Sequence, residues 1–317
     1  MPDPLPADLA PGRLLLLDTA SLYFRAFYGV PEAVRAPDGT PVNAVRGLLD
    51  FVARLVADHR PTRLVACLDA DWRPAFRVAA VPSYKAHRLA ADGGEQVPAT
   101  LAAQLPVIDA VLDALGLARI GVPGFEADDV IGTLATRATV PVDVVTGDRD
   151  LFQLVDDARA VRVLYTARGV GRLEVVTEAV VAARYGIPGR RYADLAVLRG
   201  DPSDGLPGVP GVGERTAAAL LTRFGSLDAV LQAVDDPAVT LPARPRLAAA
   251  RDYLRVAVPV VRLATDVPLP AYDDRLPAGP RDPAGLVALA DRWGLDGPLN
   301  RVLAALRTVL PAERGAG

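Results

Sequence analysis

The sequence predicts an α/β fold with a mostly parallel central sheet. Two observations predict it: short apolar runs alternate with longer helical patterns, and the first two runs are almost entirely apolar. Strands that are covered on both faces of a parallel sheet have that composition. The expected strands are residues 14–17, 64–68, 142–145 and 160–164. Helical patterns at about 43–59, 106–115, 127–138 and 178–185 complete the alternation typical of α/β proteins.

Composition places the chain among ordinary globular proteins. It has 317 residues, 51% hydrophobic and 23% charged, enough for one large domain or two smaller ones. No apolar run approaches the roughly 20 residues of a membrane span. Residues 1–6 lack a signal-peptide pattern, so we expect a cytoplasmic protein. The only cysteine, Cys67, is expected in a buried strand, and the net charge of −3 requires any nucleic-acid surface to be local.

Acidic residues follow three of the four predicted strands. Asp18 comes after the first strand, Asp69 after the second, and Asp148 and Asp150 after the third. In parallel sheets, ligands bind beyond the carboxyl ends of the strands, where several loops converge. We therefore expect these carboxylates to line one site.

Two further acidic motifs extend this set. Glu126, Asp128 and Asp129 open the helical pattern at 127–138. Helix capping is an alternative explanation, but three acids in four residues exceed what capping needs. Asp201 and Asp204 stand in a turn-rich segment that by itself is typical of a plain loop.

Nine carboxylates gathered in one cleft would repel one another without counterions. Oxygen-only ligands suit Mg²⁺ or Mn²⁺, whereas softer metals favour cysteine or histidine, and neither histidine lies in these motifs. Two divalent ions about 3.5–4 Å apart can activate a water and stabilise the leaving oxygen of a phosphoryl displacement. The acids thus predict a two-metal site.

Lys85 is the only lysine among the 35 lysine and arginine residues. Lysine is a compact charge on a flexible stem that can approach a single phosphate oxygen, whereas arginine is a planar fork. A chance survivor on the surface is the alternative explanation. Beside a metal site, a phosphate-facing lysine indicates phosphodiester chemistry.

A glycine-rich turn precedes the next helical pattern. Gly208, Gly211 and Gly213 allow backbone N–H groups to approach a phosphate, and the helix amino terminus at Arg215 and Thr216 adds its dipole. The segment matches no nucleotide-binding fingerprint. We interpret it as a helix-hairpin-helix that holds a DNA backbone without reading its sequence.

Arg25 is a candidate phosphate contact near the first strand. It stands among Tyr23, Phe24, Phe27 and Tyr28, whose helical spacing favours packing against the sheet over base stacking. We expect only Arg25 of this group to contact DNA.

In this order, the motifs resemble those of the bacterial 5′→3′ flap exonuclease family, whose members stand alone or precede the polymerase of DNA polymerase I. The resemblance runs from about Leu14 to Gly294 and rests on residues 17–18, 68–70, 84–88, 126–129, 146–150, 200–204 and 208–213. It implies a PIN-like nuclease core, a helical arch, and a helix-three-turn-helix element that binds duplex DNA and often K⁺. The implied organisation is a disordered leader at 1–11, a core at 12–195 with its arch at about 73–98, a helical DNA-binding region with C-terminal helices at 196–310, and a disordered tail at 311–317.

The resemblance also implies roles for individual residues. One metal would be held mainly by Asp18, Asp69, Glu126, Asp128 and Asp148, and the other by Asp129, Asp150, Asp201 and Asp204. Lys85 would contact the scissile phosphate, with Arg88 one helical turn away and Tyr84 stacking on a base. Arg77 is a further phosphate candidate.

Two departures from the family pattern bear on these roles. Gly205 stands where members commonly have asparagine, which is expected to loosen the loop that orients Asp204. Arginine replaces the usual lysine at Arg149 and Arg215, whereas Lys85 is retained, in support of a demanding role for that lysine.

The predicted function is a metal-dependent, structure-specific 5′→3′ exonuclease and flap endonuclease. It would cleave flapped, nicked or 5′-ended DNA, and RNA in RNA–DNA hybrids, as a nucleoid-associated monomer in primer removal and repair. A junction-binding protein without turnover is one alternative, disfavoured because all the acids and Lys85 are present. A PIN-type ribonuclease for single-stranded RNA or a small-molecule phosphatase would not need the hairpin at 208–216.

Overall fold

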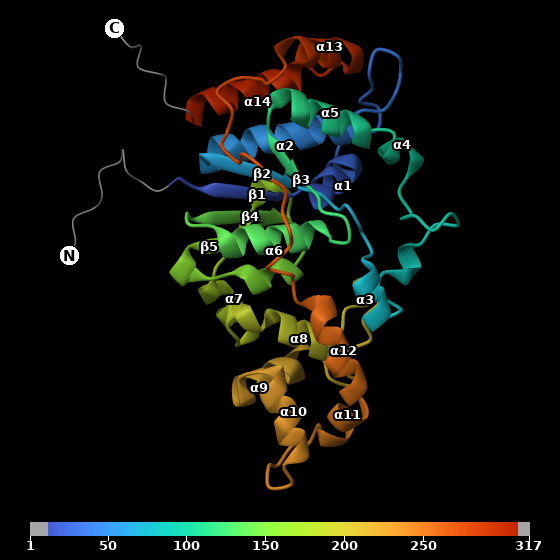
Figure 1. The fold of residues 1–317 in the computed structure, drawn as a ribbon, viewed down its shortest axis with the longest axis vertical. Coiled ribbons are helices and arrows are strands. Elements are labelled where there is room, and N and C mark those ends of the chain that lie inside the picture. Colours follow the sequence, from blue (N-terminus) through green and yellow to red (C-terminus); the bar gives the residue numbers. More distant parts are fainter. Residues whose placement is uncertain (1–11, 310–317) are drawn as a thin grey trace, which may run out of the picture.

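A computed structural model describes residues 12–309 of the chain (Figure 1). The predicted leader at 1–11 and tail at 311–317 lie outside the described residues. At the centre is a six-stranded sheet with the order β3-β2-β1-β4-β5-β6, in which the first five strands of the chain are parallel and β6 is antiparallel to β5. The strands are β1 (Leu14–Asp18), β2 (Arg63–Cys67), β3 (Ala118–Ile120), β4 (Val142–Thr146), β5 (Val161–Tyr165) and β6 (Glu174–Val176).

β1 lies between β2 and β4 because its sequence is apolar on both faces. Leu14 and Leu16 belong to the hydrophobic layer on one face of the sheet, and Leu15 and Leu17 to the layer on the other. Since β1, β2 and β4 are parallel, their carboxyl ends lie at one edge of the sheet. The prediction of an α/β fold with a mostly parallel sheet is confirmed.

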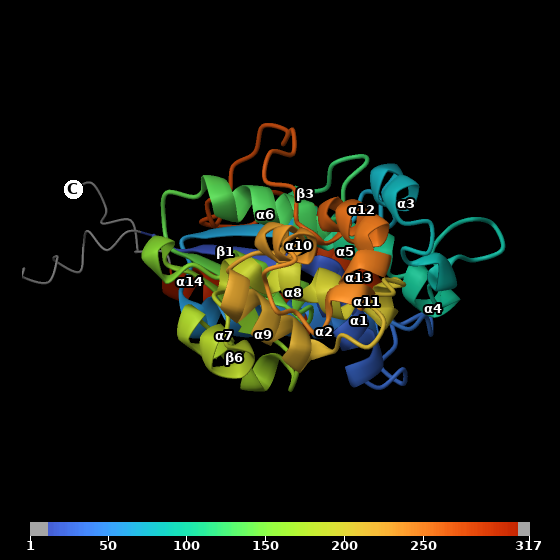
Figure 2. The same ribbon diagram turned by 90° about the horizontal axis from the view of Figure 1, so that it is seen from below.

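Helices cover both faces of the sheet (Figure 1). One layer contains α1 (Thr19–Gly29), α2 (Asn43–His59), α5 (Leu105–Leu115), α13 (Pro283–Trp293) and α14 (Asp296–Val309). The opposite layer contains α6 (Ala127–Arg137). Beyond α6 lies a helical region, seen end-on in Figure 2, that contains α7 (Glu178–Tyr185), α8 (Tyr192–Arg199), α9 (Glu214–Phe224), α10 (Leu227–Asp235), α11 (Arg244–Ala249) and α12 (Arg251–Val261).

The chain returns to the sheet after this helical region. Residues 274–276 hydrogen-bond beside β2, and α13 and α14 then pack on α5 and α2. The last two helices therefore lie over the sheet, far from α9 and α10 in sequence and in space (Figure 1). A domain division near residue 195 stays a prediction.

The predicted arch at about 73–98 leaves the carboxyl-end edge of the sheet and is drawn in teal at one side of Figure 1. It contains α3 (Ala75–Ala80), a short 3₁₀ turn (Ala86–Arg88) and a hairpin closed by a bridge between Leu89 and Glu95. α4 (Ala99–Ala102) follows it. The hairpin turn is hydrogen bonded, with the Ala90 N–H donating to Gly94 O.

The predicted strands and helices are confirmed with small shifts in their boundaries. β3 and β6 escaped prediction because three residues are too few to show a period. Within residues 12–309, no single helix is long and apolar enough to cross a membrane, and α9 with α10 passes that test only as a pair bent by 82°.

Candidate active-site cleft and DNA-binding turn

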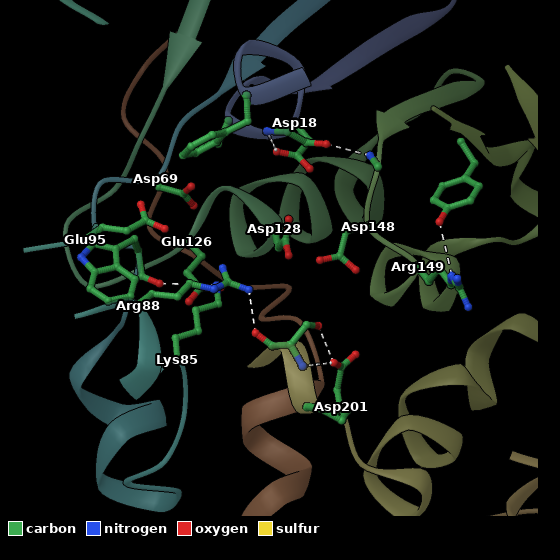
Figure 3. Close-up of a pocket in the computed structure, with 18 of the residues that line it drawn as sticks. Asp18, Asp69, Lys85, Arg88, Glu95, Glu126, Asp128, Asp148, Arg149 and Asp201 are labelled. Carbon is green, nitrogen blue, oxygen red and sulfur yellow. Dashed lines mark hydrogen bonds and ion pairs between the residues drawn. The ribbon is translucent and has the colours of Figure 1, made fainter. Parts of the chain in front are cut away.

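Six of the nine predicted carboxylates line one cleft of about 590 Å³ at the carboxyl-end edge of the sheet (Figure 3). Three follow the ends of β1, β2 and β4, two come from the start of α6, and one comes from the loop after α8. They are Asp18, Asp69, Asp148, Glu126, Asp128 and Asp201. The structure thus brings together acids that are up to 183 positions apart in the sequence, as the position of ligand sites in parallel sheets implies.

Local hydrogen bonds fix the carboxylates at the sheet edge. Asp18 accepts the Ser21 N–H at 3.1 Å, which caps α1, and accepts the Thr146 hydroxyl from the end of β4 at 2.7 Å. Asp69 accepts the Ala127 N–H at the start of α6, at 2.7 Å. Each of these acids is therefore held by an element next to its own.

Asp150 and Asp204 lie beside the cleft. They line a smaller cavity that shares Glu126 and Asp128 with it. The Asp150 N–H donates to Asp148 at 2.8 Å, and Asp204 is paired with Arg88 at 2.9 Å. Eight of the nine predicted acids therefore face two adjoining cavities.

Asp129 is the exception, and its position contradicts the predicted role as a metal ligand. It is fully buried, and its Oδ1 accepts from Arg77 Nη2 at 2.7 Å and from the Ala264 N–H at 2.9 Å. Its Oδ2 accepts the Glu126 N–H at 3.3 Å, the bond expected of a helix-capping acid. The capping explanation therefore holds for this residue.

Arg77 was predicted to contact phosphate, and its position contradicts that role too. The side chain is turned inward from α3 and the residue is only 1% exposed. Besides Asp129, its guanidinium lies 3.0 Å from Glu126 Oε2 and donates from Nε to the Val260 carbonyl of α12 at 3.0 Å. Burial of two carboxylates requires a buried cation nearby, and Arg77 supplies it while joining α3, α6 and α12.

Tyr84 is likewise buried, with 3% exposure, so the predicted stacking on a base is contradicted. Its hydroxyl donates to the Glu126 carboxylate, whose two oxygens lie 2.9 and 3.0 Å away. The Lys85 ammonium lies 5.2 Å from the centre of its ring. Tyr84 therefore supports Glu126 and Lys85 from inside the protein.

Lys85 and Arg88 do face the cleft (Figure 3). Lys85 Nζ lies 3.0 Å from Glu126 Oε2, and its side chain is 13% exposed. Arg88 Nη2 donates to Asp204 Oδ1 at 2.9 Å and to the Ser203 carbonyl at 2.8 Å. Both cations are paired with carboxylates of the site, and their contact with phosphate stays a prediction.

Burial and crowding raise the pKa of four carboxyls in the cleft, those of Asp18, Glu126, Asp128 and Asp148. Burial, reinforced by repulsion from Asp69 and Asp148, raises the pKa of Asp18 to about 7, although the Thr146 hydrogen bond opposes the shift. Burial also raises the pKa of Glu126 to about 7 against the opposing effect of Lys85 and Arg77. The cleft therefore holds negative charge at a cost that a bound cation would relieve.

The side chains that line the cleft fit hydrated divalent ions. Their acidic donors are all carboxylates, and among the described residues neither cysteine nor histidine lines the cleft. Within residues 12–309, no three or more His, Cys, Asp or Glu side chains are close enough together to form a complete metal-binding site. Mg²⁺ does not need one, because it commonly binds through one or two carboxylates and keeps several waters.

Gly205 ends the loop that carries Asp201 and Asp204, and hydrogen bonds to the arch hold it in place. Its carbonyl accepts the Ser83 hydroxyl at 2.7 Å, and its φ of +72° is in the left-handed region. The Asp204 carbonyl accepts the Lys85 N–H at 2.9 Å. The expectation that Gly205 loosens this loop is wrong because the loop is bonded to the arch.

Sequence reasoning missed Glu95, which lines the cleft from the arch hairpin (Figure 3). Burial and the neighbouring Asp69 raise the pKa of this carboxyl. The signal was present, because Asp92-Gly93 is a dipeptide typical of hairpin turns. Arg149 and Arg199 also line the cleft. Arg149 stands between the predicted acids Asp148 and Asp150, whereas nothing in the spacing of Arg199 predicted its position.

The glycine-rich turn lies before α9, outside the residues that line the cleft. Gly208 and Gly211 have φ values of +66° and +74°, and Gly213 occupies the N-cap position of α9. Arg215 and Thr216 are exposed in the first turn of that helix. Gly211 and Gly213 are exposed as well, whereas Gly208 is buried against the Arg199 backbone. Only the end of the turn next to α9 is therefore open to a ligand, and its predicted contact with DNA stays a prediction.

Arg25 is half-buried on α1 and does not line the cleft. Its guanidinium lies near Gly147, since a Cβ at that glycine would be 3.7 Å from Arg25 Nη2. Of the aromatic residues around it, Tyr28 is 73% exposed, so packing against the sheet is wrong for that side chain.

Comparison with known proteins places these features in one family. The model of the 5′-3′ exonuclease N-terminal resolvase-like domain matches residues 13–186, and that of the 5′-3′ exonuclease C-terminal SAM fold matches residues 187–284. A 5′-3′ exonuclease of Streptomyces coelicolor is 65% identical over 299 residues, covering 92% of this chain and 99% of the relative. One from Mycobacterium tuberculosis is 52% identical over 312 residues, covering 93% and 98%. The fold is similar to that of the bacteriophage T5 flap endonuclease, solved as a pseudo-enzyme-product complex with DNA and metal ions, with a TM-score of 0.60, 16% identity and coverage of 94% and 98%.

Proposed function

The chain belongs to the 5′-3′ exonuclease family, and on that premise we propose that it is a structure-specific nuclease that hydrolyses phosphodiester bonds near the 5′ ends of flapped, nicked or 5′-ended duplex DNA. The proposal includes RNA in RNA–DNA hybrids, and primer removal and repair as its settings. One observation carries it: six carboxylates and the cations Lys85 and Arg88 line a single cleft. The exposed turn before α9 supplies a separate surface for the duplex.

We assign two divalent ions, Mg²⁺ or Mn²⁺, to the carboxylates. One would lie on the sheet side among Asp18, Asp69, Glu126, Asp128 and Asp148, and the other among Asp150, Asp201 and Asp204. One or two carboxylates would bind each ion directly, and the others would act through the waters that the ion keeps. When bound, such ions lower the pKa of a water and stabilise the leaving oxygen of an in-line displacement. The oxygen donors and the raised pKa values of Asp18 and Glu126 support this assignment, and Asp129 is no longer part of it.

Lys85 and Arg88 would bind the scissile phosphate. Each now pairs with a carboxylate of the site, Lys85 with Glu126 and Arg88 with Asp204. With those carboxylates occupied by divalent ions, Lys85 and Arg88 would be free to donate to the non-bridging oxygens of a phosphate and to orient it for attack.

The duplex would be held beyond the cleft by Gly211, Gly213, Arg215 and Thr216, with Arg25 as a further phosphate contact. Gly208 is buried and would shape the turn without touching the duplex. Backbone N–H groups at a helix amino terminus bind phosphate without regard to base sequence. On the resemblance alone, we add K⁺ at this turn. We further propose that the protein acts as a monomer at the nucleoid.

The test is cleavage of a 5′-labelled flap duplex with Mg²⁺, with Mn²⁺ and with EDTA, beside a single-stranded RNA of equal length. Metal-dependent cutting of the flap with the RNA left intact is the expected result. Tight binding of the flap without cutting under either metal would instead identify a junction-binding protein. Preferential cutting of the RNA would identify a ribonuclease.

A further inference from the structure

Two segments that are far apart in the sequence are hydrogen bonded at the mouth of the cleft. Residues 83–88, here called the arch root, lie against residues 201–205, here called the acid loop. The Ser83 hydroxyl donates to Gly205 O at 2.7 Å, and the Lys85 N–H donates to Asp204 O at 2.9 Å. Arg88 adds bonds to the Ser203 carbonyl and the Asp204 carboxylate.

The approach of the two backbones depends on the absence of a side chain at Gly205. A Cβ there would lie 2.1 Å from Ser83 O and 3.0 Å from the Ser83 carbonyl carbon. Those atoms belong to the backbone and cannot rotate away as a side chain would. The φ of +72° at Gly205 also disfavours any residue with a Cβ.

The contact also constrains Lys85. Its φ is 46°, a left-handed conformation that is unfavourable for a lysine unless the surroundings hold it. The surroundings here are the Asp204 carbonyl at its backbone N–H and the Glu126 carboxylate at its ammonium. The acid loop and the sheet-edge acids thus hold the two ends of the same residue.

We propose that the arch root and the acid loop form one latch, in which Gly205 and Ser83 are positioning residues that set Lys85, Arg88 and Asp204 relative to the sheet-edge carboxylates. Separation of the two segments would displace two cations and one carboxylate of the site together. The role of the latch in catalysis rests on the proposed function, whereas the contact between the two segments does not.

The single lysine provides a direct probe of the latch. A lysine-specific endoproteinase can cut this chain only after Lys85, giving fragments 1–85 and 86–317. A protease needs an extended backbone and an accessible lysine side chain, and the latched state denies it both. Under native conditions without metal, the rate of this one cut therefore reports how often the arch root leaves the acid loop.

Gly205→Ala is the main variant, and we expect it to speed this cut about tenfold or more, because the added Cβ displaces Ser83 and raises the population of the open state. Gly39→Ala is the matched control. Gly39 has a φ of +87°, but a Cβ there would meet no atom within 4 Å. Gly39→Ala places a side chain at a comparable positive φ without touching the arch, so the rate of cutting after Lys85 should equal that of the unaltered protein.

Ser83→Ala provides a second test that keeps the backbone contact intact. It removes one hydrogen bond and should speed the cut about two- to tenfold. The effects of Ser83→Ala and Gly205→Ala should be less than additive in the double variant, because both open the same contact. Thermal melts of all variants separate local opening from global unfolding.

A second readout concerns the site itself. Ser83→Ala should lower kcat on a flap duplex while the Kd for that duplex stays unchanged, because the duplex-binding turn is untouched. If the unaltered protein cuts no flap, the proposed function fails, but the proteolysis result still decides the latch. Unchanged cutting by the protease in Gly205→Ala, or equal acceleration in Gly39→Ala, would overturn the latch.

Discussion

The two sides of the cleft are built differently. On the sheet side, Asp18 and Asp69 are held by bonds to neighbouring elements of the core, from Thr146 and Ala127. On the opposite side, the acid loop is held by an arch more than 100 positions away in the chain. The first set of positions follows from the fold of the sheet. On the second side, a bridge between Asp201 and Leu206 closes the loop locally, whereas the Asp204 carboxylate is paired with Arg88 of the arch. We call the sheet side, with Asp18 and Asp69, the fixed half of the cleft. We call the side formed by the arch root and the acid loop the conditional half.

Arg77→Met should have the largest effect on stability, because it acts where the fixed half is anchored. The change leaves Asp129 and Glu126 buried beside one cation fewer. Loss of one partner from a buried ion pair costs about 3–5 kcal/mol, measured as the free energy of unfolding in urea.

Arg162→Met is the matched control for Arg77→Met. Its partner Asp143 is also fully buried but keeps a second arginine, Arg13, so a much smaller loss is expected. Asp129→Asn introduced into the Arg77→Met background should restore part of the stability, since it removes the unpaired charge. A loss below 1 kcal/mol for Arg77→Met would mean that the buried guanidinium is not an anchor.

Lys85→Arg tests the residue that links the two halves. Its ammonium lies between Glu126 and the Trp72 carbonyl, a space suited to a compact charge. We expect turnover on a flap duplex to fall about 100-fold, the scale of losing one preorganised donor at a reacting phosphate. Duplex affinity measured in EDTA should change little, and near-normal turnover would remove the special role of lysine.

The stabilisation of the protein by Mg²⁺ should depend on pH, and the raised pKa values of two carboxyls determine the direction. Asp18 and Glu126 have folded-state pKa values of about 7, above their usual values near 4. Without metal, the unfolded chain loses these protons between about pH 4 and 7 while the folded chain keeps them, so stability falls as pH rises through that window and the penalty is complete above it. A bound cation removes the penalty.

The measurement for this pH effect is the increase in Tm on adding Mg²⁺, compared at pH 5.5 and pH 8. We expect a gain larger by about 3 °C at the higher pH. Asp69→Asn, which removes a neighbour that raises both pKa values, should reduce the difference. A gain that is larger at pH 5.5 would contradict the assignment of metal to these carboxyls.

The acids of the fixed half could be predicted from the sequence because their positions depend only on where each strand ends. An acid at the end of a parallel strand lies at the sheet edge whatever the loops do, so Asp18, Asp69 and Asp148 were placed from their positions alone. Asp129 was misassigned because an acid in a first helical turn has the same pattern whether it faces a metal or caps the helix. Only the burial of Arg77 against it separates the two cases.

The conditional half was beyond sequence reasoning for a different physical reason. The turn of Tyr84 toward Glu126 and the contact of Ser83 with Gly205 depend on how the arch packs on two distant segments, the start of α6 and the acid loop. No periodic pattern encodes that packing. Gly205 shows this most clearly. From the sequence, its missing side chain indicates a looser loop, whereas in the structure it leaves room for the backbone of Ser83. Glu95 was within reach, because the Asp-Gly turn before it is a local signal.

Arg215→Ala should have the smallest effect and touch neither half of the cleft. Arg215 is exposed in the first turn of α9. If it neutralises one phosphate, its loss should weaken duplex binding a few-fold and reduce the slope of log affinity against log salt by about one, with kcat at saturating duplex unchanged. Arg223→Ala at the other end of α9 is the control, because that side chain donates to the Thr240 carbonyl and packs on Phe224. Its salt slope should not change. An unchanged slope for Arg215→Ala, or equal changes for both variants, would show that the duplex does not bind at the start of α9. The proposed duplex-binding surface beyond the cleft would then be wrong.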